Sequence, residues 1–265
     1  MKPVKFTIAT VSFNAESLIE RTIRSVEGQT YPWIEHLIVD GNSQDETLAY
    51  VHHYQERNSL RSQPRDIICR SENDEGLYDA MNKALDLASG DYILFLNAGD
   101  KLNSKECLAQ VAQKIEEVED DLPAVVYGHT NLVDKKGNFL RPRRLAPPAK
   151  LTWKSFKRGM LVCHQAFFAR TDLAKRQPYD LRYKYSADFD WCVRILHEAA
   201  LKNLSTLKVP FPVADYLDDP EVDSLTNQHH KASLRERFNI MRHHYGWLST
   251  TVHHLGFVLR NFTLK

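Results

Sequence analysis

Short runs rich in apolar residues alternate with stretches of helical periodicity between residues 6 and 100. The short runs are typical of buried strands and lie at 6–11, 36–39, 66–69 and 92–96. Between them, apolar residues recur at helical spacing over Leu18–Val26 and Leu77–Leu87. Strands that alternate with helices predict a mostly parallel, Rossmann-like α/β sheet that is covered on both faces.

The pattern changes after Asp100 and becomes typical of antiparallel structure. Strands are predicted at 124–128, 130–133, 139–140 and 162–169, with a turn at Lys136-Gly137. Helices are predicted at 104–118, 187–200 and 231–245, loops at 141–150 and 215–227, and an extended segment broken by two prolines at 208–213. The sequence therefore predicts one α/β domain over 1–227, with a parallel half (1–100) and a mixed or antiparallel half (101–227), and a helical tail over 228–265.

Polar side chains stand where the predicted parallel strands end. Ser12 and Asn14 follow the first strand, Asp40 ends the second, and Asn97 and Asp100 follow the fourth. Ligands of such sheets bind beyond the carboxyl ends of the strands. The sequence therefore predicts a ligand site at this edge.

Composition and charge are those of an ordinary globular protein. The chain has 265 residues, of which 43% are hydrophobic and 26% charged, and its net charge of +1 gives no general attraction for nucleic acid. The tail is the exception, because from His229 onward six Lys and Arg residues accompany a single acid, Glu236.

The cysteines and the N-terminus favour a cytoplasmic protein. The four cysteines are scattered without a CxxC pair, which is typical of reduced thiols rather than disulfides or a metal site. The N-terminus has no signal-peptide pattern, and no apolar run reaches the roughly 18 residues of a membrane span.

Three ordered motifs resemble those of family 2 glycosyltransferases. They are Thr10–Asn14 with the later Gln29-Thr30, the segment Ile38–Thr47 with its Asp40-Gly41-Asn42-Ser43-x-Asp45 core, and the segment Gly76–Asp100. The resemblance implies a GT-A fold and inverting transfer of a sugar from a nucleotide-sugar donor, a UDP-sugar by preference, to a glycan or lipid-linked sugar.

The same resemblance implies which residues bind the donor. Asp40 would accept a hydrogen bond from the nucleobase, although an Asp before Gly41 can also cap its turn. Thr10, Ser12 and Asn14 would line this pocket, or Ser12 and Asn14 would bind turn backbone instead. Asn73 and Asp79 would contact ribose and phosphate, with surface residues as the alternative.

The segment Asn97-Ala98-Gly99-Asp100 resembles the family's metal-binding turn and departs from it. The family pattern reads Leu-Asp-x-Asp-Asp, whereas Asn97 and Gly99 replace its first two acids. A departing diphosphate is well neutralised by a hard divalent cation with oxygen ligands. Asp100 and Asn97 would hold Mn²⁺ or Mg²⁺ together with the diphosphate. The alternative is that Asp100 only caps the next helix.

Ser186–Arg194 resembles the family's catalytic helix start, with Ala187 in place of a Glu. Asp188 would be the base that takes the proton of the acceptor hydroxyl, or else a plain helix cap. Asp190 faces elsewhere on the helix and would cap it or pair with Arg194. His164, after Cys163 at the start of the strand predicted at 162–169, would bind substrate or metal, or serve structure alone.

Other candidates carry weaker signals. The adjacent histidine pairs at 52–53, 229–230, 243–244 and 253–254 are predicted to be solvated surface. Arg141, Arg143 and Arg144 would clamp phosphates or belong to an ordinary loop. The apolar stretch Leu255–Phe262 would contact an anionic bilayer, at the inner face of a membrane, or pack on its own domain or in a dimer.

Two other functions fit parts of the sequence. A sugar nucleotidyltransferase also uses a parallel sheet and Mg²⁺, but Ser12-Phe13-Asn14-Ala15 lacks the Gly-rich, basic loop that it needs after the first strand. A non-catalytic nucleotide-sugar-binding protein of the same fold is the other alternative, because of the losses at Asn97, Gly99 and Ala187.

Overall fold

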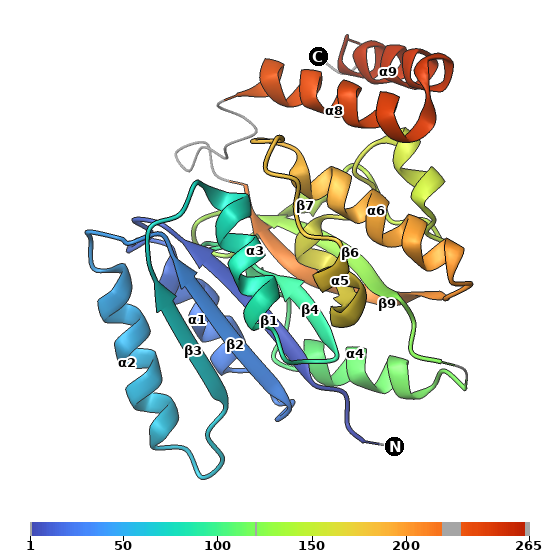
Figure 1. Cartoon of the computed structure of the whole chain (residues 1–265). Helices are drawn as coiled ribbons and strands as arrows, with labels where there is room; N and C mark the ends of the chain where they lie inside the picture. Colours follow the sequence, from blue (N-terminus) through green and yellow to red (C-terminus); the bar gives the residue numbers. More distant parts are fainter. Residues whose placement is uncertain (1, 120, 219–228, 263–265) are drawn as a thin grey trace.

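The protein is a mixed α/β domain with helices on both faces of a twisted sheet (Figure 1). The computed structural model describes residues 2–119, 121–218 and 229–262, and for 255–262 it describes only the backbone. Figure 1 shows the helices α8 and α9 as a pair at one end of the molecule, beyond α6 and far from α2.

The strands are β1 (Phe6–Ser12), β2 (Ile34–Asp40), β3 (Asp66–Ser71), β4 (Tyr92–Phe95), β5 (Lys101–Leu102), β6 (Val125–Val133), β7 (Phe139–Pro142), β8 (Phe167–Arg170) and β9 (Thr206–Leu217). The helices are α1 (Ile19–Glu27), α2 (Thr47–Ser59), α3 (Leu77–Leu87), α4 (Cys107–Glu116), α5 (Thr171–Arg176), α6 (Ala187–Leu201), α8 (His230–Tyr245) and α9 (Trp247–Phe262). Two 3-10 helices are η1 (Trp153–Arg158) and η2 (His164–Ala166).

The sheet confirms the predicted change from parallel to mixed pairing. In the described residues it has nine strands in the order β3-β2-β1-β4-β8-β6-β9-β5, with β7 paired to β6. β1 pairs in parallel with β2 and β4, and β2 with β3. From β8 onward antiparallel pairs dominate, the parallel pair of β6 with β9 excepted.

The core lies on both sides of β1, β2 and β4, whose residues are almost all buried. On the side of α1 and α2, Ile38 packs against Ile23 and Tyr54. Thr10 belongs to this layer, because its hydroxyl lies 3.0 Å from Nε2 of His36, whose Nδ1 lies 3.2 Å from the hydroxyl of Tyr54. Burial lowers the pKa of His36 to about 3, so this histidine is neutral.

Several predicted elements differ in the structure. The strand predicted at 162–169 begins only at Phe167, because 164–166 form the 3-10 helix η2. The segment predicted as broken at 208–213 lies inside the continuous strand β9. Its prolines are tolerated because the pairing with β6 is irregular there, with Pro212 opposite His129. The strands predicted at 124–128 and 130–133 are one strand, β6.

The tail packs on the rest of the chain through α8. Ile240 and Met241 are buried, and the hydroxyl of Tyr245 donates to the carbonyl of Trp153 at 2.6 Å. No helix in the described ranges is long and apolar enough to span a membrane. The loop predicted at 215–227 is wrong for its first residues, because β9 continues to Leu217 through its pairing with β6. Residues 219–227 of this prediction and the side chains of Leu255–Phe262 lie outside the described residues.

Candidate functional site

A cavity of about 320 Å³ opens at the carboxyl ends of β1 and β4, where the sequence predicts a ligand site. Residues from both halves of the chain line it. The predicted site residues in its wall are Ser12, Asn14, Asn97, Asp100, His164 and Asp188. The predicted site residues outside its wall are Thr10, Asp40, Asn73 and Asp79.

Asp188 is the second residue of α6, and its carboxylate is held from two sides. The hydroxyl of Tyr78 donates to Oδ1 at 3.3 Å, and Nδ1 of His164 lies 3.3 Å from Oδ2. Burial is the largest influence on Asp188 and opposes its ionisation, but the hydrogen bond from His164, the nearby positive charge and the backbone N–H of Phe189 together outweigh it. The pKa of Asp188 is therefore lowered below the ordinary 3.8. The carboxylate is therefore ionised at neutral pH and able to accept a proton.

Asn97 determines which nitrogen of His164 carries the proton. Nδ2 of Asn97 lies 3.2 Å from Nε2 of His164. An amide NH₂ can only donate, so Nε2 accepts and the ring proton stays on Nδ1, where it faces Asp188. With the amide reversed, a neutral ring would leave Nδ1 and the carboxylate as two acceptors facing each other, and only a ring protonated on both nitrogens would keep the contact with Asp188. Oδ1 of Asn97, in turn, is buried and has no hydrogen-bond partner.

Asp100 is buried at the bottom of the turn that follows β4. Its Oδ2 accepts from Nε2 of Gln165 at 2.7 Å, and its Oδ1 accepts from the backbone N–H of Leu217 at 3.1 Å. Burial raises the pKa of Asp100 to about 6, although both hydrogen bonds favour the ionised form. Gly99 has a φ of 99°, so this turn needs the glycine that replaces the family's second acid.

The turn offers part of a site for a divalent cation. The carboxylate of Asp100 and the unpartnered Oδ1 of Asn97 are hard oxygen donors of the kind that Mg²⁺ and Mn²⁺ prefer. Nowhere in the described part of the chain do three or more His, Cys, Asp or Glu side chains form a metal-binding group. The residues fit a cation whose remaining ligands come from the substrate and water.

Asp40 is completely buried at the end of β2, and its carboxylate already accepts four hydrogen bonds. The donors are the Ser12 hydroxyl, the Ser43 hydroxyl and backbone N–H, and the Ser71 hydroxyl, at 2.5 to 3.1 Å. These bonds occupy about all the acceptor positions of a carboxylate. A nucleobase would reach Asp40 only if a serine hydroxyl turned away.

The other predicted donor-binding residues have structural partners. Asn14 accepts the backbone N–H of Gln44 at 2.9 Å through Oδ1, which fixes the loop after β2. Asn73 is exposed and accepts from Nδ2 of Asn42 at 3.0 Å. Asp79 lies 3.4 Å from the ammonium of Lys83. Of this group, Asn14 lines the cavity.

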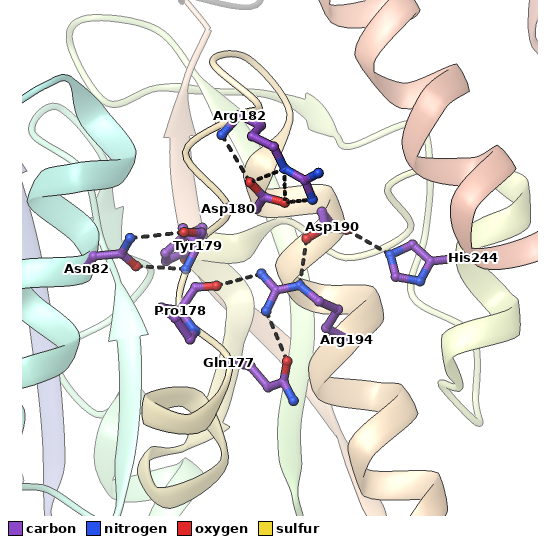
Figure 2. Close-up of polar contacts among 9 residues, drawn as sticks. All are labelled: Asn82, Gln177, Pro178, Tyr179, Asp180, Arg182, Asp190, Arg194 and His244. Atoms are coloured by element: carbon purple, nitrogen blue, oxygen red, sulfur yellow. Dashed lines mark hydrogen bonds and ion pairs between the residues drawn. The ribbon is translucent and has the colours of Figure 1, made fainter.

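Figure 2 shows that Asp190 points toward Arg194 and the C-terminal helix α8, and Asp190 does not line the cavity. Its Oδ2 lies 2.6 Å from Nε of Arg194, and its Oδ1 lies 2.7 Å from Nε2 of His244. The predicted pair with Arg194 is confirmed. Arg194 also donates to the side chain of Gln177 and the carbonyl of Pro178, so this network holds the loop before α6.

The weaker candidates have mostly ordinary surroundings. His52, His53, His229 and His230 are exposed as predicted. The prediction is wrong for His244, which contacts Asp190 and exposes only 12% of its side chain. Arg141 pairs with Asp218, and Arg143 donates to the carbonyl of Met160. All four cysteines are free, as predicted.

Sequence reasoning missed Tyr78 and Gln165, which position the two carboxylates of the cavity. Gln165 directly follows the candidate His164, so its sequence position was a usable signal. Tyr78 stands at a position that helical periodicity assigns to the core. Its ring does stack on Tyr179, with 5.5 Å between the centroids, and only its hydroxyl reaches Asp188.

A larger hollow of about 990 Å³ lies at the amino ends of β1 and β2. A polar group in its wall has a structural role. Arg65 in its wall donates to the backbone carbonyls of Val26 and Glu27 at the end of α1, and to that of Tyr31. Its guanidinium thereby caps the C-terminal end of α1. The smaller cavity, with its ionised and unpartnered groups, is the better candidate for chemistry.

Comparisons with known proteins agree on one family. The model of glycosyl transferase family 2 matches residues 7–176. The PGL/p-HBAD biosynthesis glycosyltransferase of Mycobacterium tuberculosis is 35% identical over 197 residues, which are 74% of this chain and 71% of the relative. The amylovoran biosynthesis glycosyltransferase AmsB of Erwinia amylovora is 29% identical over 73% of this chain and 64% of its own length.

Solved structures share the fold at low sequence identity. TarS 1-349 of S. aureus in complex with UDP-GlcNAc matches 98% of this chain and 73% of that chain, with a TM-score of 0.70 and 19% identity. The mannosyltransferase PcManGT of Pyrobaculum calidifontis in complex with GDP-Man and Mn²⁺ matches 98% and 65%, with a TM-score of 0.62 and 16% identity. The predicted GT-A fold is confirmed.

Proposed function

The chain belongs to glycosyl transferase family 2 and is a glycosyltransferase, and from this premise we propose that it moves a sugar from a nucleoside-diphosphate donor to an acceptor hydroxyl with inversion. A UDP-sugar is the favoured donor, and the pathway is the synthesis of a polysaccharide or another glycan. The observation that carries this proposal is the cavity in which Asp100 and Asn97 from one half of the chain meet His164 and Asp188 from the other.

The reaction is a single displacement at the anomeric carbon. The acceptor oxygen forms a bond to this carbon from one face while the bond to the diphosphate breaks on the other. Asp188 takes the proton of the acceptor hydroxyl, and His164 and Tyr78 hold its carboxylate in place. A carboxylate of low pKa is ionised and ready for this task, and its hydrogen bonds limit how strongly it attracts the proton.

Asp100 and Asn97 would hold a divalent cation, Mn²⁺ or Mg²⁺, on the donor side of the cavity. When bound, the cation neutralises the diphosphate that leaves. Asp40 would recognise the nucleobase after a hydroxyl of Ser12 or Ser71 turns away, and Asn73 and Asp79 would contact ribose and phosphate from the rim. Relatives solved with UDP-GlcNAc and with GDP-Man and Mn²⁺ support a nucleotide-sugar donor.

A lipid-linked acceptor would place the enzyme at the inner face of a membrane. The start of α9 supports this part of the proposal, because Trp247, Leu248 and Val252 expose 62%, 87% and 69% of their surface. The guanidinium of Arg242 lies 5.9 Å from the ring centroid of Trp247. An apolar and a cationic group therefore lie side by side, as binding to an anionic bilayer requires.

A thermal-shift screen of nucleotide sugars, with and without Mn²⁺, tests the donor. A UDP-sugar at a hundredfold its dissociation constant should stabilise the protein by roughly 2.7 kcal/mol, and Mn²⁺ should increase the shift. Equal shifts from ATP would contradict the role of Asp40. Donor binding without any sugar transfer or donor hydrolysis would favour the non-catalytic alternative.

A further inference from the structure

We propose that Lys184 binds the diphosphate of the donor and that Glu236, on the C-terminal helix α8, holds Lys184 in position for this. The inference rests on the proposed nucleoside-diphosphate donor. It assigns to the helical tail a part in substrate binding, in addition to its packing on the domain.

The charges in the cavity wall point to Lys184. Asp100 and Asp188 contribute two carboxylates, and Lys184 is the only lysine or arginine among the described residues that line the cavity. A nucleoside diphosphate brings further negative charge to the same space. The turn after β4 keeps only one of the family's acids, so a cation bound there is held by few protein charges and the protein needs a cationic group of its own.

The ammonium of Lys184 is available for a ligand. Its side chain is exposed, and no acid within the described ranges forms an ion pair with it. Other lysines near the strand ends differ in this respect. Lys83 lies 3.1 Å from Glu72, and Lys101 lies 3.0 Å from Asp215.

The backbone of this segment is fastened to α8 at three successive residues. Oε1 of Glu236 accepts the N–H of Lys184 at 2.9 Å, and Oε2 accepts the N–H of Tyr185 at 2.9 Å. The next residue, Ser186, has its hydroxyl 2.9 Å from that of Ser233, and both serines are buried. One carboxylate therefore fixes the direction in which Lys184 leaves the backbone.

Only a carboxylate can perform this double acceptance. A glutamine at 236 would turn an NH₂ group toward one of the two N–H donors and lose that bond. The residue pair also lies beyond the part of the chain that the family model matches, which ends at residue 176. The arrangement is thus a feature of this chain's C-terminal part, separate from the motifs of the N-terminal half.

The test compares ligands with and without the diphosphate. Binding of UDP and of uridine is measured by calorimetry in the presence of a chelator, so that no cation contributes. Lys184→Gln should weaken UDP binding roughly tenfold, as expected for a lost charge-assisted contact, and leave uridine binding unchanged. Lys184→Arg should stay within about threefold of the wild type because the charge remains.

Two further variants complete the test. Lys231→Gln removes an exposed lysine of α8 that does not line the cavity, and it should bind UDP like the wild type. Glu236→Gln should weaken UDP binding in the same direction as Lys184→Gln, and the double variant should be no weaker than Lys184→Gln alone. That result separates positioning through Lys184 from a general loss of structure.

The outcomes are distinguishable. Unchanged UDP affinity in Lys184→Gln, or an equal loss of uridine affinity, overturns the role of Lys184. Additive losses in the double variant overturn the role of Glu236. The wild type is also measured with UDP and GDP in the presence of Mn²⁺. If it binds neither nucleotide there, the proposed donor is wrong, and that failure is visible before any variant is made.

Discussion

Nδ1 of His164 lies 3.3 Å from Oδ2 of Asp188 although the two residues come from different elements, η2 and α6. The side chains are largely shielded, with 12% and 18% of their surfaces exposed. Asn97 holds the other ring nitrogen, so the residue that replaces a metal-binding acid supports the proposed base through one intermediate side chain.

Two substitutions of His164 separate its two contacts. The Nδ2 of an asparagine stands near the position of the histidine Nδ1, whereas the Nε2 of a glutamine stands near that of Nε2. His164→Asn should keep a donor for Asp188 and lower kcat less than tenfold. His164→Gln should lose that donor and lower kcat by roughly 10- to 100-fold, the value of a hydrogen bond to a charged group. Equal losses in steady-state kinetics would show that His164 does not act through Asp188.

Asp188→Asn should impair catalysis and spare stability, whereas Asp190→Asn should impair stability and largely spare catalysis. Asp188→Asn keeps the shape but removes proton acceptance, so transfer should fall by on the order of 10²–10⁴ while nucleotide affinity and Tm stay near wild type. Asp190→Asn weakens the charge-assisted hydrogen bonds with Arg194 and His244 and should cost about 2 kcal/mol of unfolding free energy. Its kcat should change far less. An inactive Asp190→Asn with normal Tm would show that the base is misassigned.

Asp100 should make the apoprotein less stable as the pH rises. Its pKa of about 6 in the folded protein lies above the ordinary 3.8, so the folded state binds the extra proton between about pH 4 and 6. The stabilisation of the folded state by this proton is fully present below about pH 4, declines between about pH 4 and 6 and is lost above about pH 6. The free energy of unfolding thereby changes by about 3 kcal/mol.

Asp100→Asn removes this dependence. The amide of Gln165 can reverse and accept from the new Asn, so the hydrogen bonds survive. In chelator, denaturant unfolding should give the variant up to about 3 kcal/mol more stability than wild type at pH 7, and similar stability at pH 4. Transfer should nevertheless fall, since the carboxylate for the cation is gone. A variant that is less stable at pH 7 would refute the buried-charge explanation.

Tyr78→Phe isolates the second contact of Asp188. The phenyl ring keeps its stacking on Tyr179, so Tm should change little, while kcat should fall a few-fold because one hydrogen bond to the carboxylate is lost. Combined with His164→Gln, the loss should exceed the product of the single losses, because Asp188 is then held by neither partner. Purely multiplicative effects would show that the two contacts act independently.

The hydrophobic pattern was sufficient to predict the strands and helices of the parallel half. It was insufficient where contacts between distant segments determine the local structure. β1, β2 and β4 follow the pattern closely because they are buried on both faces, and α3 follows it because it buries one regular face. The two prolines of β9 indicate a break in the sequence, and only the irregular pairing with β6 makes them acceptable. η2 likewise replaces the start of a predicted strand, where His164 must turn toward Asn97.

At the site, the polar residues at the ends of the elements could be predicted from the sequence, whereas their hydrogen-bond partners could not. Asp100, His164 and Asp188 are polar residues at the ends of elements, which the sequence reveals. The contact of Asp40 with Ser43 is the turn capping that the sequence offers as an alternative. The hydroxyls of Ser12 and Ser71 come from neighbouring strands, and no local pattern records them. The contact of His244 with Asp190 also depends on the docking of α8, whereas its sequence is that of a solvated helix.

The strand β5 directly follows the turn that holds Asp100, yet it pairs with β9, where Lys101 lies opposite Asp215. Leu217, at the end of β9, donates its N–H to the carboxylate of Asp100. During synthesis the ribosome must therefore add more than a hundred further residues before this turn can take its final form. A nascent chain that already contains every motif proposed to bind the donor still lacks the contact between Leu217 and Asp100. The proposed donor should therefore protect the chain from proteases only after β9 has emerged.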